Sequence, residues 1–169
     1  MKNKIFKIKN AYTLTELMAV VVIIGILGVI SAPLLNNLNQ NIMMAKTRLS
    51  LQQDARNFMS LITKILREAK SSTVVITRNN SSQPFYSKIV FSTIDGKNYQ
   101  FYQDGKNLVM VDSNNVKILS SDLRYLAFTF PESSDLAIVS ISMTLEKDLF
   151  SGMKKALHMA SEKVMIMNE

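Results

Sequence analysis

The sequence predicts an α+β fold in which a long amino-terminal helix packs on an antiparallel β-sheet. Three observations predict this fold. Residues 17–35 form an apolar run without a charged side chain, and residues 36–70 continue it with an amphipathic helical pattern. The remainder contains short β-rich runs, two pairs of which are separated by Asp-Gly. The 169 residues are enough for one ordinary globular domain in addition to the amino-terminal segment.

The apolar run is long enough to cross most of the ~30 Å hydrocarbon core of a bilayer at ~1.5 Å per residue. Lysines at positions 2, 4, 7 and 9 precede it, with no acidic residue among them. The positive-inside rule therefore places residues 1–11 in the cytoplasm and the carboxyl-terminal part across the membrane. Two interpretations follow. One is an ordinary secretory signal with a weak small-x-small cleavage site near Ser31 and Ala32. The other places the cleavage before the apolar run.

A family resemblance supports the second interpretation. The basic leader, the stretch AYTLTEL from Ala11 to Leu17 and the apolar run resemble the type III signal of type IV pilins and type II secretion pseudopilins. The resemblance implies cleavage by prepilin peptidase between Ala11 and Tyr12 and N-methylation of Tyr12. Glu16 matches the glutamate of the family, and Pro33 matches its helix-bending proline. The family usually has Gly and Phe where this chain has Ala11 and Tyr12.

The position of Glu16 also has a physical explanation. A carboxylate inside a bilayer costs several kcal/mol and is tolerated chiefly where it has a partner or a function. Cleavage before Tyr12 would create an α-amino group one helical turn from Glu16, in the same chain or in a neighbouring one. In a bundle of such helices this pairing would neutralise both charges and fix the axial register. The alternative is that Glu16 lies at headgroup depth, stabilised by the positive end of the helix dipole.

Residues 36–70 carry apolar side chains every three or four positions, which predicts that the helix continues from Tyr12 to about Ala69 and needs a cover for its apolar stripe. Strands are predicted in the segments that follow, with hairpin turns at Asp95-Gly96 and Asp104-Gly105. The predicted strands are residues 87–94, 98–103, 107–112, 116–119, 124–130 and 137–145. Residues 154–167 are ambiguous between helix and strand, and we assign a strand.

The order of these elements resembles the minor pilins of the J-type pseudopilin and W-type pilus group, which implies a pilin-like fold. That group often ends in Arg-Asn, where this chain has Met167 and Asn168. The sequence thus divides into a basic leader (residues 1–11), a transmembrane or filament-core helix (12–35), an amphipathic helix (36–70) and a β-rich head packed on that helix (71–169).

Other candidate sites receive little support. The single histidine, His158, does not favour a metal cluster or a catalytic triad, and no phosphate-binding glycine motif is present. Asp95 and Asp104 precede glycines, as expected of turns. Without Cys the chain has no disulfide, thiolate metal site or Cys nucleophile. Four of the seven net positive charges lie in the leader, so charge does not predict nucleic-acid binding.

The eleven methionines have two interpretations, core filling or an adaptable interaction surface formed by Met43, Met44, Met159, Met165 and Met167. Core filling is the default expectation, because methionine is an ordinary core residue.

The sequence therefore predicts a structural protein without cofactor or metal, and not an enzyme. By resemblance it is a minor pilin or pseudopilin of a type IV pilus or a type II secretion pseudopilus, which initiates assembly at the filament tip. Its expected partners are prepilin peptidase, other major and minor subunits, and the inner membrane. It would first reside there as a single-pass protein with its head outside the cytoplasm and then in the filament. The alternative is a signal-anchored membrane protein with an exported ligand-binding domain.

Overall fold

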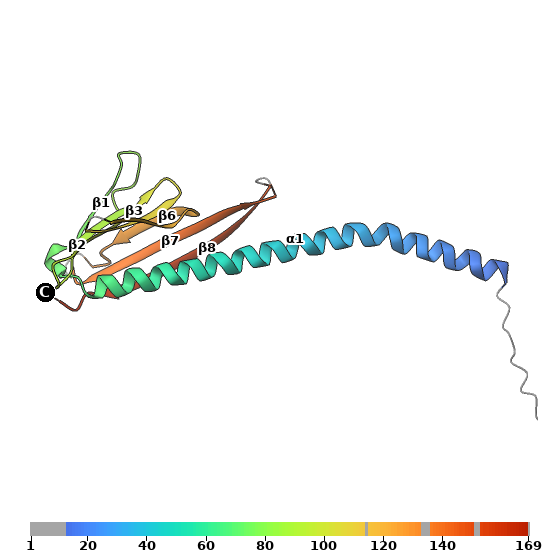
Figure 1. Ribbon diagram of the computed structural model, residues 1–169, viewed down its shortest axis with the longest axis horizontal. Helices are drawn as coiled ribbons and strands as arrows, with labels where there is room; N and C mark the ends of the chain where they lie inside the picture. The colour runs from blue at the N-terminus through green and yellow to red at the C-terminus, as the bar shows by residue number, and fades with distance from the viewer. Residues whose placement is uncertain (1–12, 114, 133–135, 151–152, 169) are drawn as a thin grey trace, which may run out of the picture. The chain divides into compact units, whose positions relative to one another are not determined.

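The computed structural model describes residues 13–113, 115–132, 136–150 and 153–168 (Figure 1). One long helix precedes a series of strands, so the α+β class predicted from the sequence is confirmed. The elements are α1 (Leu14–Arg67), the 3₁₀ helix η1 (Ser71–Thr73), β1 (Val75–Thr77), β2 (Lys88–Ser92), β3 (Asn98–Asp104), β4 (Asn107–Asp112), β5 (Asn115–Ser120), β6 (Leu123–Thr129), β7 (Ile138–Leu149) and β8 (Lys154–Met165).

The chain divides after Met43 into two compact units, and α1 contributes to both. The first unit holds the apolar beginning of α1. Every described residue up to Asn39 is exposed within the protein, including the whole apolar run. The helix is long and apolar enough to cross a membrane, a test that a signal sequence also passes. This surface therefore has no cover within the described part of the chain.

The second unit contains a five-stranded antiparallel sheet in which strands β1 to β5 pair in chain order. Both predicted Asp-Gly turns lie in this meander. Gly96 has φ +76° and Gly105 has φ +58°, a backbone region that glycine occupies without the steric cost of a Cβ atom. Asp104 pairs with Asn107, which leaves Gly105 as the first of two loop residues in a tight hairpin.

A second sheet contains β6, β7 and β8, again antiparallel and in chain order. The predicted strand at residues 154–167 is therefore present as β8. The sheets meet where β6 passes β2 and β3. There the Phe128 N–H donates to the Tyr86 carbonyl oxygen at 2.8 Å, and the Leu126 N–H donates to Gln103 Oε1 at 3.1 Å. These hydrogen bonds satisfy polar groups of the strand at the junction.

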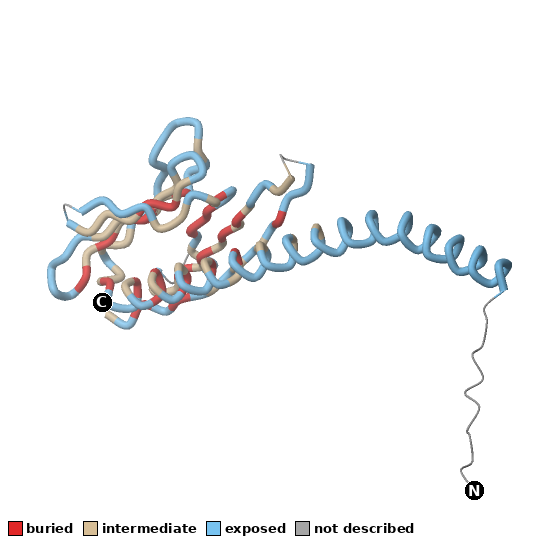
Figure 2. The backbone as a smooth tube through the Cα atoms, turned by 45° about the vertical axis from the view of Figure 1, so that its right-hand side comes forward, coloured by how far each residue is buried: buried red, intermediate tan, exposed pale blue. Residues whose placement is uncertain are grey.

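The core of this unit lies between the two sheets and the last turns of α1 (Figure 2). Helix residues Leu51, Ala55, Ile62 and Leu66 are at most 1% exposed and belong to the same cluster as buried residues of both sheets. Their spacing of four, seven and four residues places them on one helix face. Burial of that face removes apolar surface from water, the main force that holds the helix to the strands.

The end of the chain closes this unit against the end of α1. Asn168 Nδ2 donates to the Arg67 carbonyl oxygen at 3.1 Å, and the Ser71 N–H donates to the Asn168 carbonyl oxygen at 2.9 Å. The last carbonyls of a helix have no partner within the helix, so the asparagine supplies one of the missing donors. It thereby fixes the end of β8 beside the helix.

Three details differ from the sequence-based expectation. The strands form two sheets rather than one, because β6 pairs with β7 and not with β5. The three-residue strand β1 was not predicted, since it is too short for a recognisable alternation. Three apolar side chains of the predicted stripe in residues 36–70, those of Leu38, Ile42 and Leu49, are about half exposed, whereas Met59, which the stripe did not include, is buried.

Candidate functional site

The beginning of α1 positions Glu16, the first of the predicted site residues. The Thr13 N–H donates to Glu16 Oε2 at 2.9 Å, and Thr13 Oγ1 donates to the same oxygen at 3.1 Å. In return, the Glu16 N–H donates to Thr13 Oγ1 at 3.3 Å. This reciprocal arrangement is a capping box of the form Thr-x-x-Glu, which satisfies otherwise unpaired donors at a helix start.

The capping box gives Glu16 a role within its own chain that we did not predict, although the stretch Thr13-Leu14-Thr15-Glu16 carries its signature. The carboxylate also lies in the first turn, where the helix dipole favours a negative charge. Both hydrogen bonds to the carboxylate use Oε2. The second oxygen, Oε1, remains for a partner outside these contacts.

The predicted cleavage and methylation site, Ala11 and Tyr12, lies outside the described residues. The pairing of the Tyr12 α-amino group with Glu16 stays a prediction. Pro33, the predicted kink, lies inside α1, which is helical on both sides of it. A proline has no N–H, so the carbonyl oxygen of Val29 loses its intrahelical donor at this point. The Ser31 hydroxyl makes a further local contact, donating to the Leu27 carbonyl oxygen at 2.6 Å.

The apolar helix surface around these residues is the largest uncovered feature of the first unit. Side chains such as Leu14, Val29 and Leu35 are 59–79% exposed. An added Cβ atom at Gly25 or Gly28 would meet nothing within 4 Å. Packing within the described chain therefore explains neither glycine, and the surface is suited to an apolar environment supplied from outside, either lipid or other helices.

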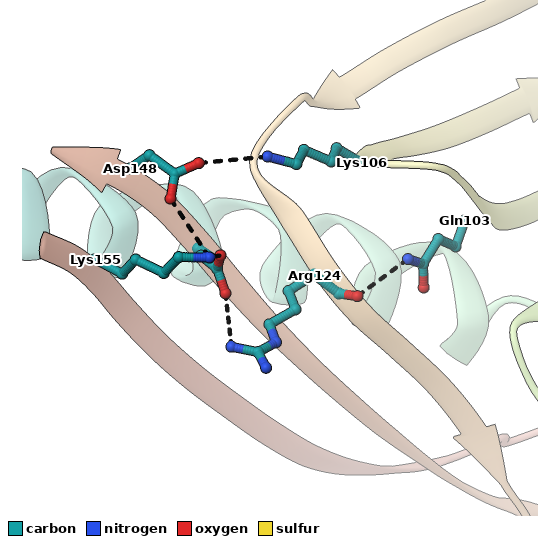
Figure 3. A network of polar contacts seen from close by, with 6 residues as sticks. Gln103, Lys106, Arg124, Asp148 and Lys155 are labelled. Carbon is teal, nitrogen blue, oxygen red and sulfur yellow. Dashed lines mark hydrogen bonds and ion pairs between the residues drawn. The ribbon is translucent and has the colours of Figure 1, made fainter. Parts of the chain in front are cut away.

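The head carries a group of charged side chains on β6, β7 and β8 (Figure 3). Arg124 Nη1 lies 2.6 Å from Glu146 Oε2, and Lys155 Nζ lies 2.5 Å from Glu146 Oε1. Asp148 lies 3.6 Å from both Lys155 and Lys106, so the cluster also reaches the turn between β3 and β4. The hydrogen bond from Lys155 lowers the pKa of Glu146, and the same hydrogen bond raises the pKa of Lys155.

This cluster connects strands β6, β7 and β8 of one sheet and reaches the other sheet through the ion pair between Lys106 and Asp148. Its two carboxylates are matched by three cations, and it contains no histidine, hydroxyl or thiol. His158 lies elsewhere, half-buried on β8 opposite Leu145. Among the described residues, no three His, Asp or Glu side chains gather as a metal site would require.

Comparison of the chain with known proteins returned no match to a family model, to a curated protein or to a solved structure.

Proposed function

We propose that this chain is a structural subunit of the type IV pilin and type II secretion pseudopilin class, and a minor subunit that initiates assembly at the filament tip. The observation that carries the proposal is the uncovered apolar helix with Glu16 in its first turn. The basic leader directly before it supports the same class. The packing of the later turns of α1 on antiparallel sheets is compatible with a pilin-like layout.

In the proposed mechanism, the apolar part of α1 first holds the subunit in the inner membrane. Prepilin peptidase removes residues 1–11, and the helix then moves from lipid into a bundle of equivalent helices. Both environments cover the same apolar surface, so the transfer requires little change in hydrophobic free energy. The charge on Glu16 is the feature that distinguishes them, because the bundle adds the α-amino groups of neighbouring subunits as partners.

The mature amino terminus gives the first test. Mass spectrometry of the native protein should find a chain that begins at a methylated Tyr12. A chain that retains Met1, or one cleaved near Ala32, would contradict the proposal. Either result would favour a signal-anchored or secreted protein instead.

Three variants then separate the charge of Glu16 from its capping role. Glu16→Gln keeps an acceptor for the Thr13 N–H but removes the charge, whereas Thr13→Ala keeps the charge and removes the hydroxyl. We expect Glu16→Gln and Glu16→Ala to insert into the membrane normally and to lose at least ten-fold in filament incorporation. Thr13→Ala should retain most of the filament incorporation of the wild type. Full incorporation of Glu16→Gln would show that the helix cap, not charge pairing, explains the residue.

A further inference from the structure

The strand β8 forms one edge of the three-stranded sheet, because it pairs with β7 alone. Its register with β7 is unbroken over twelve residue pairs, from Lys154 opposite Leu149 to Met165 opposite Ile138. The N–H of Ile166 donates to the carbonyl oxygen of Ala137, so even-numbered residues of β8 direct their backbone groups toward β7. Odd-numbered residues, such as Ser161, therefore direct theirs away from the sheet. The described part of the chain places no hydrogen-bond partner against them before Asn168.

A groove of about 580 Å³ runs between this edge and the last turns of α1. Arg56, Lys64 and Arg67 line it from the helix, and Glu162 lines it from β8. With Glu68, the lining holds three cations and two carboxylates. None of the three cations forms an ion pair within the described residues, whereas the cluster of Figure 3 is fully paired. The groove lining thus has a formal net charge of +1, and its cations are free of ion pairs within the described residues.

The opposite face of the edge is partly apolar, with three apolar side chains among Lys155, Ser161 and Lys163. Leu157, Met159 and Met165 are 47%, 77% and 62% exposed, and they alternate with residues that face the helix. Exposed edge strands of this length are templates for a further strand, and natural proteins guard them with charged side chains such as the lysines of β8, which select the charge of the strand that can bind. The methionine side chain adapts its shape to different partners, a property that suits a binding surface. Here the interaction-surface interpretation of Met159 and Met165 is favoured over core filling.

We propose that the β8 edge binds an extended acidic segment of a partner protein by strand addition. Backbone groups of the partner pair with the odd-numbered residues of β8. Its alternate side chains are carboxylates directed into the groove toward Arg56 and Lys64, and apolar side chains directed toward Met159. The proposal does not depend on filament assembly, since the edge and the groove belong to the second unit alone.

Charge favours such a partner over the other occupants. A second copy of β8 would add Lys154, Lys155 and Lys163 to the three lysines already on this edge, and like charges on paired strands are destabilising. The leader of this chain is also basic, so the groove repels it. The groove attracts an acidic segment from a distance. The alternation of carboxylate and apolar side chains along that segment then fixes its register against β8.

The binding test uses the full chain in non-ionic detergent micelles. The probe is a fluorescein-labelled peptide of alternating Glu and Val, observed by fluorescence anisotropy, with an alternating Lys and Val peptide and protein-free micelles as controls. We expect saturable binding of the Glu peptide, at least ten-fold tighter than that of the Lys peptide. No binding of the Glu peptide, or equal binding of both peptides, would overturn the proposal.

Two sets of variants test the geometry. Ser161→Pro removes an N–H that points away from the sheet but no hydrogen bond to β7, and we expect at least ten-fold weaker binding. Its control, Ser161→Ala, removes only the side-chain contact to Ser142 and should bind within two-fold of the wild type. A folded Ser161→Pro protein with unchanged affinity would exclude strand addition.

Charge reversal gives a test that does not depend on the folding of the proline variant. Arg56→Glu with Lys64→Glu should weaken binding of the Glu peptide at least ten-fold. The control, Lys46→Glu with Arg48→Glu, changes the net charge equally at exposed positions of the same helix outside the groove. It should weaken binding of the Glu peptide less than three-fold. Equal effects of the two pairs would overturn the proposal. So would a dimer in sedimentation that Ser161→Pro converts to a monomer, because it would identify a second copy as the occupant.

Discussion

Ile62 provides the most direct test of how α1 is held to the strands. Its side chain is 0% exposed and belongs to the core cluster that joins the helix to both sheets. Truncation of a buried isoleucine to alanine costs about 2–5 kcal/mol, from lost transfer free energy and the cavity that remains. Residues from Met44 onward form a unit of about 126 residues, whose unfolding entropy at ~2.1 cal/mol/K per residue is about 265 cal/mol/K. Ile62→Ala should therefore lower its Tm by about 8–19 °C.

Near-UV circular dichroism of the tyrosines is a suitable probe, because the chain has no Trp and the described tyrosines all lie in the second unit. Ile62→Val should lower the Tm by only about 2–6 °C, since it removes one methylene at about 0.5–1.5 kcal/mol. Leu49→Ala is the matched control, because Leu49 is 57% exposed on the same helix and its truncation should shift the Tm by about 2 °C or less. A shift for Ile62→Ala no larger than for Leu49→Ala would refute helix docking as the source of stability.

Three further predictions concern the head. The Tm of the wild type should exceed that of Glu146→Gln above pH 5, and the difference should vanish on acidification through the lowered pKa of Glu146, because protonation then removes the stabilising charge. The hydrogen bond with Tyr86 raises the pKa of Tyr125 to about 12, so its stabilising effect should be lost as the pH rises from about 10 to 12. An ultraviolet titration of Tyr86→Phe should show Tyr125 ionising at a lower pH than in the wild type. Gly96→Ala should lower the free energy of unfolding by about 1–2 kcal/mol, because φ is +76° and open space surrounds the site, so the cost comes from the backbone alone. An unchanged Tm in thermal unfolding would contradict this explanation.

The local elements were predictable because their signals are local. The 3.6-residue period of residues 36–70 predicted the end of α1 to within two residues, and the Asp95-Gly96 and Asp104-Gly105 pairs located two turns. The division into two sheets was not predictable in this way. The choice of β7 over β5 as the partner of β6 depends on contacts across the junction, such as the hydrogen bond from Leu126 to Gln103, and no periodic pattern records them.

The candidate site was predictable in identity but not in geometry. The charge of Glu16 beside an apolar run predicts a partner, an α-amino group of the same chain or of a neighbouring one. The structure adds the internal partner, Thr13, through a motif that was present in the sequence. In the head, the geometry had to be known before the binding surface could be identified. The exposed edge of β8 depends on which strand lies beside it, so its methionines could not be assigned to a surface before the pairing was known.

The capping box and the proposed charge pair are compatible, and together they explain why a glutamate stands at this position. Cleavage after Ala11 would leave Thr13 in place, so the hydrogen bonds to Oε2 persist in the mature chain. The new α-amino group would then approach Oε1, and one carboxylate would complete the helix start and neutralise a subunit terminus. Each role alone tolerates substitution, since glutamine also completes a capping box and an aspartate also carries the charge. The two roles together require both the length of the glutamate side chain and its charge.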